Sequence, residues 1–303
     1  MEVPGDLVHI RTGHTRLPHW LRKPETHFES VQYLKRYLRR LNLNTVCESA
    51  RCPNMHECFH RGAATFMILG NVCTRGCGFC AVPKGRPEKA AMPYDPDEAA
   101  NVAEMARRMG LRHVVITSVN RDDLPDGGSA HFAATVRAVR RALPEAQVEV
   151  LTPDFRGDTD AVARVLDAGP HVFNHNMETI APLYRKVRPQ ADYRQSLAVL
   201  AFAGRRAPGV LVKSGLMAGL GETEEQVCEL MDDLRAAAVE VVTIGQYLQP
   251  SRRNMAVVEY VPPERYERWS EYGRRIGFKR VFAGPFVRSS YMADMVNHQA
   301  RTL

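Results

Sequence analysis

Six of the seven cysteines in this chain of 303 residues lie between Cys47 and Cys80. A disulfide scaffold is usually short and secreted, and its cysteines are spread through the whole fold. A clustered set in a longer chain indicates instead that thiolates bind a metal. Cys228 stands apart in a run of helical spacing from Glu222 to Ala238, where we expect a buried or unreactive neutral thiol.

The later half of the cluster is Cys73, Cys77 and Cys80, which we call the strand-loop set because it follows a predicted strand at Ala64 to Gly70. Its spacing, C-x3-C-x2-C, lets one loop wrap three thiolates around one centre. A structural zinc normally has four ligands, whereas three thiolates on a [4Fe-4S] cluster leave one iron open to a substrate or cofactor. The spacing favours the cluster over a zinc loop completed by a distant fourth ligand.

The earlier half is Cys47, Cys52 and Cys58, which we call the N-terminal set. Its spacing is C-x4-C-x5-C, and it also lacks a fourth cysteine. A cluster held here needs either a ligand that is not cysteine or an open iron. The candidates by residue type are His56, His60 and a hydroxyl from elsewhere in the chain.

From about residue 64 onward, short β-rich runs alternate with amphipathic helical runs, as expected for parallel strands joined by crossover helices. Apolar residues share one helical face at 102–109 and again at 132–143. The run Asp95-Pro96-Asp97-Glu98 predicts an N-cap, so the first of these helices is expected to begin there. The predicted strands are Ala64 to Gly70, His113 to Val119, Val148 to Asp154, Val172 to Asn176, Val210 to Met217, Val241 to Gln246 and Arg280 to Ala283.

Six or seven such units predict an α/β fold, a full or partial (β/α) TIM-type barrel whose chemistry lies at the C-terminal ends of the strands. Polar residues follow several of the predicted strands, as at Ser118, Asn176 and Gln246. The predicted organisation is an N-terminal extension at 1–60 that carries the N-terminal set, a barrel at 61–285 and a C-terminal segment at 286–303.

The strand-loop set resembles the cysteine motif of the radical S-adenosylmethionine (SAM) superfamily, and Phe79 matches the aromatic residue usual before its third cysteine. The resemblance implies a [4Fe-4S] cluster whose open iron binds the amino and carboxylate groups of SAM. One electron from that cluster cleaves SAM into methionine and a 5'-deoxyadenosyl radical. The radical then abstracts hydrogen from an unactivated carbon.

Both cysteine sets together, with Arg288-Ser289-Ser290-Tyr291 near the C-terminus, resemble the lipoyl synthase family. Tyr291 and Arg288 would then position the C-terminal segment. The resemblance covers about residues 45 to 294. Further similar stretches are 64–70, 121–128, 173–176 and 246–251.

The family resemblance implies two [4Fe-4S] clusters with unlike roles. The strand-loop set would hold the cluster that generates each radical. The N-terminal set, with the Ser289 hydroxyl on its fourth iron, would hold an auxiliary cluster that supplies sulfur to C6 and C8 of an octanoyl-lysine on a carrier domain. An alkoxide is a harder and weaker ligand than a thiolate, so this iron is expected to be the easiest to release. Two SAM molecules would be consumed per product.

The segment 212–222 is similar to the strand that lies against the adenine of SAM in the superfamily, although its glycines equally fit an ordinary strand-to-helix turn. It includes Lys213, which we predict as a SAM contact. Ser118, Asn176 and Glu178 are predicted ribose or methionine contacts. The chain departs from the family pattern at Asn71, Asn120, Met292 and 251–254, none of which is a predicted cluster ligand.

The composition, with 45% hydrophobic and 25% charged residues, is typical of a soluble protein. No apolar run reaches the length of a membrane span, and no secretory signal is present, so we expect a cytoplasmic protein that binds no membrane. The formal charge of +7 favours an acidic partner without identifying it. A solvated surface with no specific partner explains the charge equally well.

The family resemblance implies three kinds of partner and no nucleic acid. They are an octanoylated lipoyl-carrier domain, an electron donor such as a flavodoxin or ferredoxin, and iron-sulfur assembly or carrier proteins. A radical SAM methylthiotransferase is an alternative enzyme, although the stretch after Phe286 is too short for the RNA-binding barrel usual there. A zinc-stabilised interaction protein is the non-enzymatic alternative.

Overall fold

The computed structural model describes residues 17–22, 28–50, 52–60, 64–86 and 95–290. Its centre is one eight-stranded sheet whose strands follow one another in chain order. The first strand runs antiparallel to the second, and all later neighbours are parallel. The strands are β1 (Asn44–Thr45), β2 (Thr65–Ile68), β3 (His113–Ser118), β4 (Gln147–Leu151), β5 (Val172–Asn174), β6 (Leu211–Ala218), β7 (Val241–Gln246) and β8 (Arg280–Gly284).

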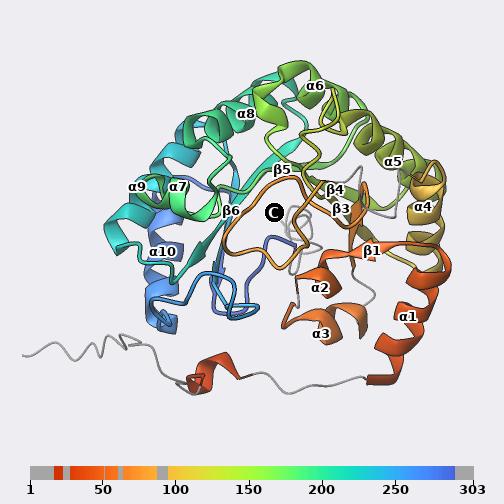
Figure 1. Ribbon diagram of the computed structural model, residues 1–303. Helices are drawn as coiled ribbons and strands as arrows, with labels where there is room; N and C mark the ends of the chain where they lie inside the picture. The colour runs from red at the N-terminus through yellow and green to blue at the C-terminus, as the bar shows by residue number, and fades with distance from the viewer. Residues whose placement is uncertain (1–16, 23–27, 51, 61–63, 87–94, 291–303) are drawn as a thin grey trace, which may run out of the picture.

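Helices cover the outer side of this sheet as a continuous arc (Figure 1). In the described residues no pairing joins β8 to β1 or β2, so the barrel is partial, as predicted. The α-helices are α1 (Phe28–Arg40), α2 (Val46–Ser49), α3 (Met55–His60), α4 (Glu98–Arg108), α5 (Ser129–Ala142), α6 (Thr159–Asp167), α7 (Tyr184–Val187), α8 (Tyr193–Arg206), α9 (Glu224–Ala236) and α10 (Pro263–Arg275).

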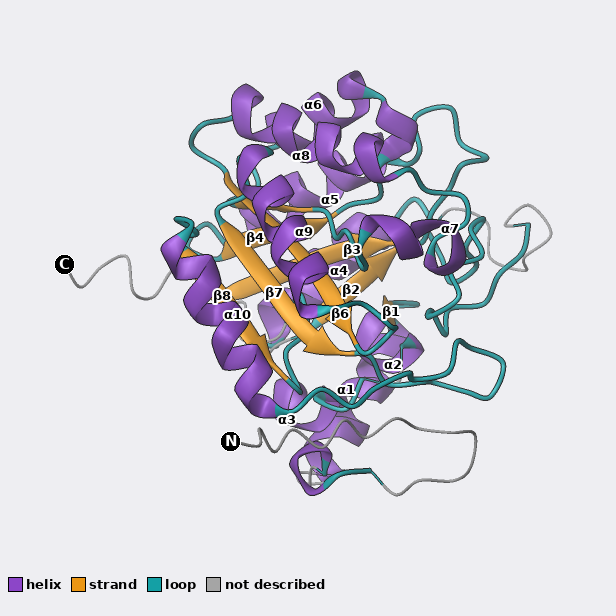
Figure 2. Cartoon of the chain, turned by 90° about the vertical axis from the view of Figure 1, so that its left-hand side faces the viewer, coloured by secondary structure: helices purple, strands orange, loops and turns teal. Residues whose placement is uncertain are grey.

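The parallel strands explain why the loops that carry chemistry meet on one side of the molecule. Figure 2 shows the arrowheads of the strands pointing toward the side where α2 and α7 lie. The predicted apolar helix faces are confirmed: Val102 and Met105 of α4 and Phe132 and Val136 of α5 are buried. None of the described helices combines the length and the apolar character that a membrane span requires.

Two sequence predictions about element boundaries are wrong. Strand β1 precedes the predicted first strand and pairs with β2, so the chain before residue 64 contributes to the sheet. Helix α4 begins at Glu98, three positions after the predicted cap at Asp95. The carboxylate of Glu98 is buried, where it accepts a hydrogen bond from the backbone N–H of Leu69 at 2.8 Å and pairs with Nε2 of His131 at 2.6 Å. It therefore ties α4 to its neighbours instead of closing a capping box.

Candidate active site

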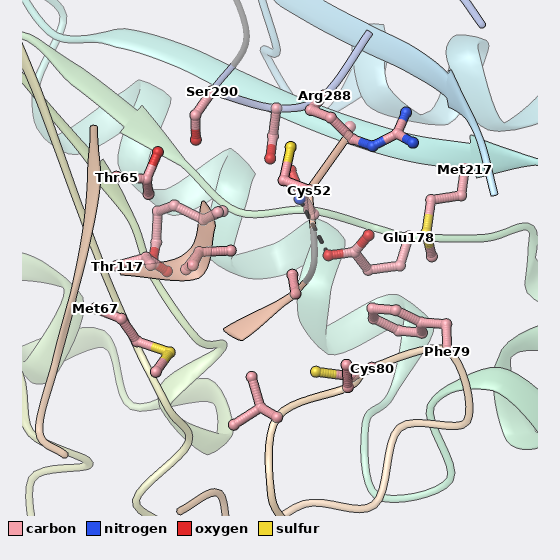
Figure 3. Close-up of a pocket in the computed structure, with 18 of the residues that line it drawn as sticks. Cys52, Thr65, Met67, Phe79, Cys80, Thr117, Glu178, Met217, Arg288 and Ser290 are labelled. Carbon is pink, nitrogen blue, oxygen red and sulfur yellow. Dashed lines mark hydrogen bonds between the residues drawn. The ribbon is translucent and has the colours of Figure 1, made fainter. Parts of the chain in front are cut away.

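A cavity of about 560 Å³ opens at the C-terminal ends of the strands, where a (β/α) barrel places its chemistry. Figure 3 shows Cys52, Arg288 and Ser290 at one end and Phe79 and Cys80 at the opposite end. All six cysteines of the two sets line this cavity, together with Ser289 and Ser290. The structure therefore brings together, around one space, residues that lie more than two hundred positions apart.

The strand-loop set is held in place by a buried ion-pair network centred on Arg75. Its guanidinium pairs with Asp122 at 2.7 Å and with Asp154 at 2.7 Å, and each carboxylate receives two hydrogen bonds. Burial alone would raise the pKa of Asp154, but the hydrogen bonds and the charge of Arg75 outweigh it and lower that pKa. Two-point pairing fixes the orientation of Arg75, so the backbone between Cys73 and Cys77 has little freedom.

Neighbouring loops hold the rest of the strand-loop set through backbone atoms. The N–H of Cys73 donates to the carbonyl of Pro83 at 2.8 Å. The side chain of Asn254 donates to the carbonyl of Cys80 at 2.9 Å, and the N–H of Gly76 donates to Oε1 of Gln190 at 2.9 Å. All three cysteines of the set line the cavity.

The N-terminal set lies on α2 and α3 and the turn between them. Cys47 is in α2, which Thr45 caps by accepting from the N–H of Glu48. The N–H of Cys52 donates to the carbonyl of Cys47 at 3.1 Å, and the N–H of Cys58 donates to the carbonyl of Asn54 at 2.9 Å. These bonds bring three cysteines that are spread over twelve positions to one wall of the cavity.

The electrostatics of the thiols fit a metal cluster. Burial, followed by the nearby charges of Cys52 and Cys58, raises the pKa of Cys47 to about 12. Burial likewise raises the pKa of Cys80 to about 11, with smaller contributions from Cys77 and Cys73. Three thiolates can ionise together at such a place only if a cation compensates them, which is what a bound iron-sulfur cluster supplies. The donor types and their burial therefore fit a cluster at each set.

A single zinc ion makes a different demand, since its ligand atoms must converge within about 2.3 Å of one point. Among the described residues, no group of three or more His, Cys, Asp or Glu side chains is arranged to hold a single metal ion.

Of the three predicted candidates for a fourth ligand of the N-terminal set, the hydroxyl is the one that the structure places in the cavity. Ser289 lines it, whereas His56 does not, and the side chain of His60 lies outside the described part of the chain. Asn54 donates from Nδ2 to the carbonyl of Phe286 at 2.7 Å and so ties the C-terminal segment to the N-terminal set. Tyr291, the last residue of the predicted motif, lies outside the described residues.

Three of the four predicted SAM contacts line the cavity, namely Ser118, Asn176 and Glu178. Oγ of Ser118 and Oδ1 of Asn176 are buried and have no hydrogen-bond partner among the described residues. Nδ2 of Asn176 donates to Glu178 at 3.0 Å, and burial raises the pKa of Glu178. Buried polar atoms are normally satisfied, so these groups are available to a polar ligand.

Two further residues of this wall were missed as site residues. His175 donates from Nδ1 to the carbonyl of Thr152 at 2.9 Å, which leaves Nε2 as an unpartnered acceptor. Burial lowers the pKa of His175 to about 4, so the ring is neutral at pH 7. Arg188 is also buried in the cavity wall, where it donates to the carbonyl of Asn176 at 2.8 Å. The stretch 173–176, which resembles the family, was the available signal for His175.

Lys213, the fourth predicted SAM contact, is not among the residues that line the cavity. Its ammonium group is buried and pairs with Glu149 at 3.0 Å. Glu149 also accepts from Asn174 at 3.1 Å and pairs with His113 at 3.2 Å. Burial would raise the pKa of Glu149, but Lys213 and then His113 outweigh it and lower that pKa to about 2. Lys213 therefore belongs to a charged network inside the barrel.

We expect Lys213→Met to destabilise the protein by about 3 to 5 kcal/mol, because it leaves the buried Glu149 carboxylate without its cation. Adding Glu149→Gln should restore most of the Tm, since no unpaired charge then remains. Thermal unfolding and SAM binding of both variants check this. If Lys213→Met lost SAM affinity while its Tm stayed at the wild-type value, Lys213 would be a ligand contact and this account of it would be wrong.

The fold agrees with solved radical SAM enzymes, and the cysteine loop at the end of the first parallel strand is the feature of that class. A family model of the radical SAM superfamily matches residues 67–234. HydG, a maturase of the [FeFe]-hydrogenase, superposes with a TM-score of 0.55 at 14% identity, covering 76% of this chain and 58% of that one. SuiB from Streptococcus suis, bound to S-adenosylmethionine, gives 0.55 at 13% identity, covering 84% and 61%. The chain is thus a radical SAM protein, a class that implies SAM and a [4Fe-4S] cluster.

Proteins with higher sequence identity show to which family of that class the chain belongs. A model of the N-terminal domain of lipoyl synthase matches residues 1–52. Lipoyl synthase from Caldanaerobacter subterraneus is 54% identical over 280 residues, which is 92% of this chain and 96% of that protein. Lipoyl synthase from Thermus thermophilus is 52% identical over 280 residues, 92% and 86% of the two chains. The chain belongs to the lipoyl synthase family.

Proposed function

We propose that this protein is a sulfurtransferase of lipoate biosynthesis that inserts two sulfur atoms, at C6 and C8 of a protein-bound octanoyl-lysine, to give the lipoyl group. The observation that carries the proposal is the shared cavity, because both cysteine sets and Ser289 line it. A hydrogen-abstracting group and a sulfur source must reach the same carbon atoms. One cavity with a thiolate set at each end meets that requirement.

The strand-loop set would hold the SAM-binding [4Fe-4S] cluster, and the N-terminal set with Ser289 would hold the auxiliary one. When bound, these groups supply a 5'-deoxyadenosyl radical and sulfur, respectively, with two SAM molecules consumed per product. Arg75 keeps the strand-loop set rigid through Asp122 and Asp154.

The polar wall formed by Ser118, Asn176 and Glu178 offers acceptors to the ribose or the amino group of SAM. Nε2 of His175, neutral at pH 7, adds one more acceptor. The remaining wall is largely apolar and suits an acyl chain, because it excludes water from the carbon that reacts. Its apolar members include Met67, Val115, Val119, Leu151 and Leu216.

The partners of this reaction are an octanoylated carrier domain, a one-electron donor such as a flavodoxin or ferredoxin, and iron-sulfur assembly or carrier proteins that rebuild the auxiliary cluster. The reaction needs neither nucleic acid nor a membrane, and we place it in the cytoplasm. An acidic carrier would be attracted by the net charge of +7.

Anaerobic turnover tests the proposal most simply. The enzyme is incubated with dithionite, SAM and an octanoylated carrier domain, and the carrier is weighed by mass spectrometry. We expect the mass of two added sulfur atoms together with 5'-deoxyadenosine. If 5'-deoxyadenosine forms and the carrier mass never changes, the assigned substrate is wrong.

The variant Ser289→Cys tests whether Ser289 serves to release iron from the auxiliary cluster or only to hold that cluster. A thiolate binds iron more tightly than an alkoxide, so the variant should retain the iron content of the wild type and transfer sulfur more slowly. Iron analysis and single-turnover product formation measure the two properties. Ser289→Ala serves as the control that removes the ligand. Full sulfur transfer by Ser289→Cys would contradict the release role of Ser289.

A further inference from the structure

Three segments that are separated in sequence meet on the outer side of the strand-loop set, at Gly78. The N–H of Gly78 donates to the carbonyl of Val187 at the end of α7, at 2.9 Å. The carbonyl of Gly78 accepts from the N–H of Met255 at 3.0 Å and from the side chain of Asn254 at 3.3 Å. A Cβ on Gly78 would lie 2.8 Å from the Met255 side chain, so any larger residue here would have to displace Met255. Helix α7 and the loop at 251–255 therefore flank Gly78, one of the two residues between Cys77 and Cys80.

The segments that meet at Gly78 are basic and contain no acidic residue. Neither Asp nor Glu occurs in 73–86, 181–191 or 247–258. Two of their cations act inside the protein, Arg75 in its ion-pair network and Arg188 in the cavity wall. The others have exposed side chains; they are Lys84, Arg86, Arg185, Lys186, Arg252 and Arg253.

We call Arg185, Lys186, Arg252 and Arg253 the basic patch, because they lie on the two segments bonded to Gly78. Within the described part of the chain, no ion pair joins Arg185, Lys186 or Arg253 to a carboxylate. Arg185, Lys186 and Arg253 thus present like charges that pair with no acidic side chain in the described ranges. Like charges kept together without compensation are suited to an acidic partner.

Surface arginines elsewhere show the contrast. Arg268 of α10 pairs with Glu224 at 2.8 Å, and Arg206 of α8 pairs with Asp167 at 2.8 Å. Arg107 of α4 pairs with Glu104 at 3.0 Å. Other exposed arginines, such as Arg137 and Arg205, form no ion pair among the described residues either, so what distinguishes the basic patch is the lack of Asp and Glu in its own segments.

The place of the patch relative to the cavity distinguishes between partners. Arg185, Lys186 and Arg253 do not line the cavity, whereas Cys77, Phe79 and Cys80 do. Arg188 and Pro250, on the same two segments, do line it, so the patch lies next to the cavity wall, beside the backbone that joins Cys77 to Cys80. An acyl chain on a docked carrier needs an open path to the substrate carbon. An electron needs only proximity to the group that the cysteines hold, and the bonds to Gly78 give the patch that proximity.

We propose that the basic patch docks the acidic surface of a small one-electron carrier protein and so delivers reducing equivalents behind the strand-loop set. This inference rests on the proposed function, which requires one electron for each SAM cleaved. The partner gives up one electron to the group held by Cys73, Cys77 and Cys80, and no atom is exchanged. The basic residues raise the rate of encounter and fix the partner over the shortest path to that group.

The test compares two reductants on the reconstituted holoenzyme. The variant Arg185→Glu, Lys186→Glu, Arg253→Glu is assayed once with dithionite and once with an acidic flavodoxin, using the octanoylated carrier as substrate. The control variant Arg137→Glu, Arg141→Glu, Arg205→Glu makes the same change of net charge on the exposed outer faces of α5 and α8. The Kd of flavodoxin for each protein and its dependence on salt are measured separately from activity.

With dithionite, we expect both variants to match the wild type, including the KM for the carrier. With flavodoxin, the patch variant should lose about tenfold or more in kcat/KM for the reductant and in binding, and the loss should shrink as salt is added. The control variant should change less than about twofold.

Three results would overturn the inference. Equal losses in the two variants would show a general charge effect, and unchanged flavodoxin binding would remove the patch from docking. A raised KM for the carrier under dithionite would show that the patch docks the substrate protein. If the wild type makes no lipoyl product even with dithionite, the proposed function fails, which is distinct from each of these results.

Discussion

Cys52→Ala is expected to cleave SAM at close to the wild-type rate and to form no sulfur-containing product, whereas Cys77→Ala is expected to do neither. The two residues line the same cavity but belong to different thiolate sets, Cys52 on the turn after α2 and Cys77 on the loop after β2. Each variant should fall from about eight irons per chain to about four, because each loses one cube. The readouts are iron, 5'-deoxyadenosine and the carrier mass.

Equal iron loss makes these two variants controls for each other. Their difference in 5'-deoxyadenosine then reports which set generates the radical. Product formation by Cys52→Ala, or 5'-deoxyadenosine from Cys77→Ala, would contradict the division of roles between the two sets.

Gly245→Ala is expected to lower sulfur transfer by about a hundredfold while SAM cleavage continues. A Cβ on Gly245 would overlap the carbonyl oxygen of Val287, so the backbone that carries Ser289 would have to move. A displacement of about 1 Å at a reacting group can cost that much in rate. Product and 5'-deoxyadenosine are measured in the same reaction, and retained iron is measured separately.

Gly284→Ala is the matched control for this substitution. Gly284 is the register partner of Gly245 on the neighbouring strand, and its added Cβ would lie 3.5 Å from a methyl of Val287, an ordinary contact. We expect this control to behave as the wild type. Equal activity of both alanine variants would show that the C-terminal segment does not depend on the space that Gly245 leaves.

Much of the fold can be predicted from short stretches of the sequence. The strand at 241–246 was predicted at its observed bounds, because a run rich in β-branched residues is buried on both faces. Strand β1 was missed because two residues show no periodicity. The start of α4 was placed at Asp95, whereas its N-cap is Asp97. Local rules also could not predict that Glu98 pairs with His131, a partner 33 positions away.

In the candidate site, too, the features set by neighbouring residues could be predicted, and those set by distant contacts could not. Cysteine spacing revealed both thiolate sets, since neighbouring ligands must be close in sequence for one loop to hold them. Lys213 was predicted at the cavity because its segment resembles a SAM-binding strand, yet its partner Glu149 lies 64 positions away. The seat of the C-terminal segment, made by Asn54 and Gly245, likewise depends on contacts between distant parts of the chain.

Three segments that are distant in sequence each contribute candidate ligands to the cavity. The loop after β2 carries the strand-loop set, the segment from α2 through α3 carries the N-terminal set, and 286–290 brings Ser289. A cluster held between separate segments can lose its atoms without unfolding the barrel that holds the other. The central claim is therefore that the cluster on the N-terminal set is the source of both sulfur atoms.

The most direct measurement uses enzyme whose clusters are rebuilt with isotopically heavy sulfide. After a single turnover with unlabelled SAM and an octanoylated carrier domain, the product is analysed by mass spectrometry. Two heavy sulfur atoms in the same lipoyl group are predicted, together with the loss of about four irons from the N-terminal set. A product that contains only light sulfur, formed while all of the iron is retained, would contradict the account.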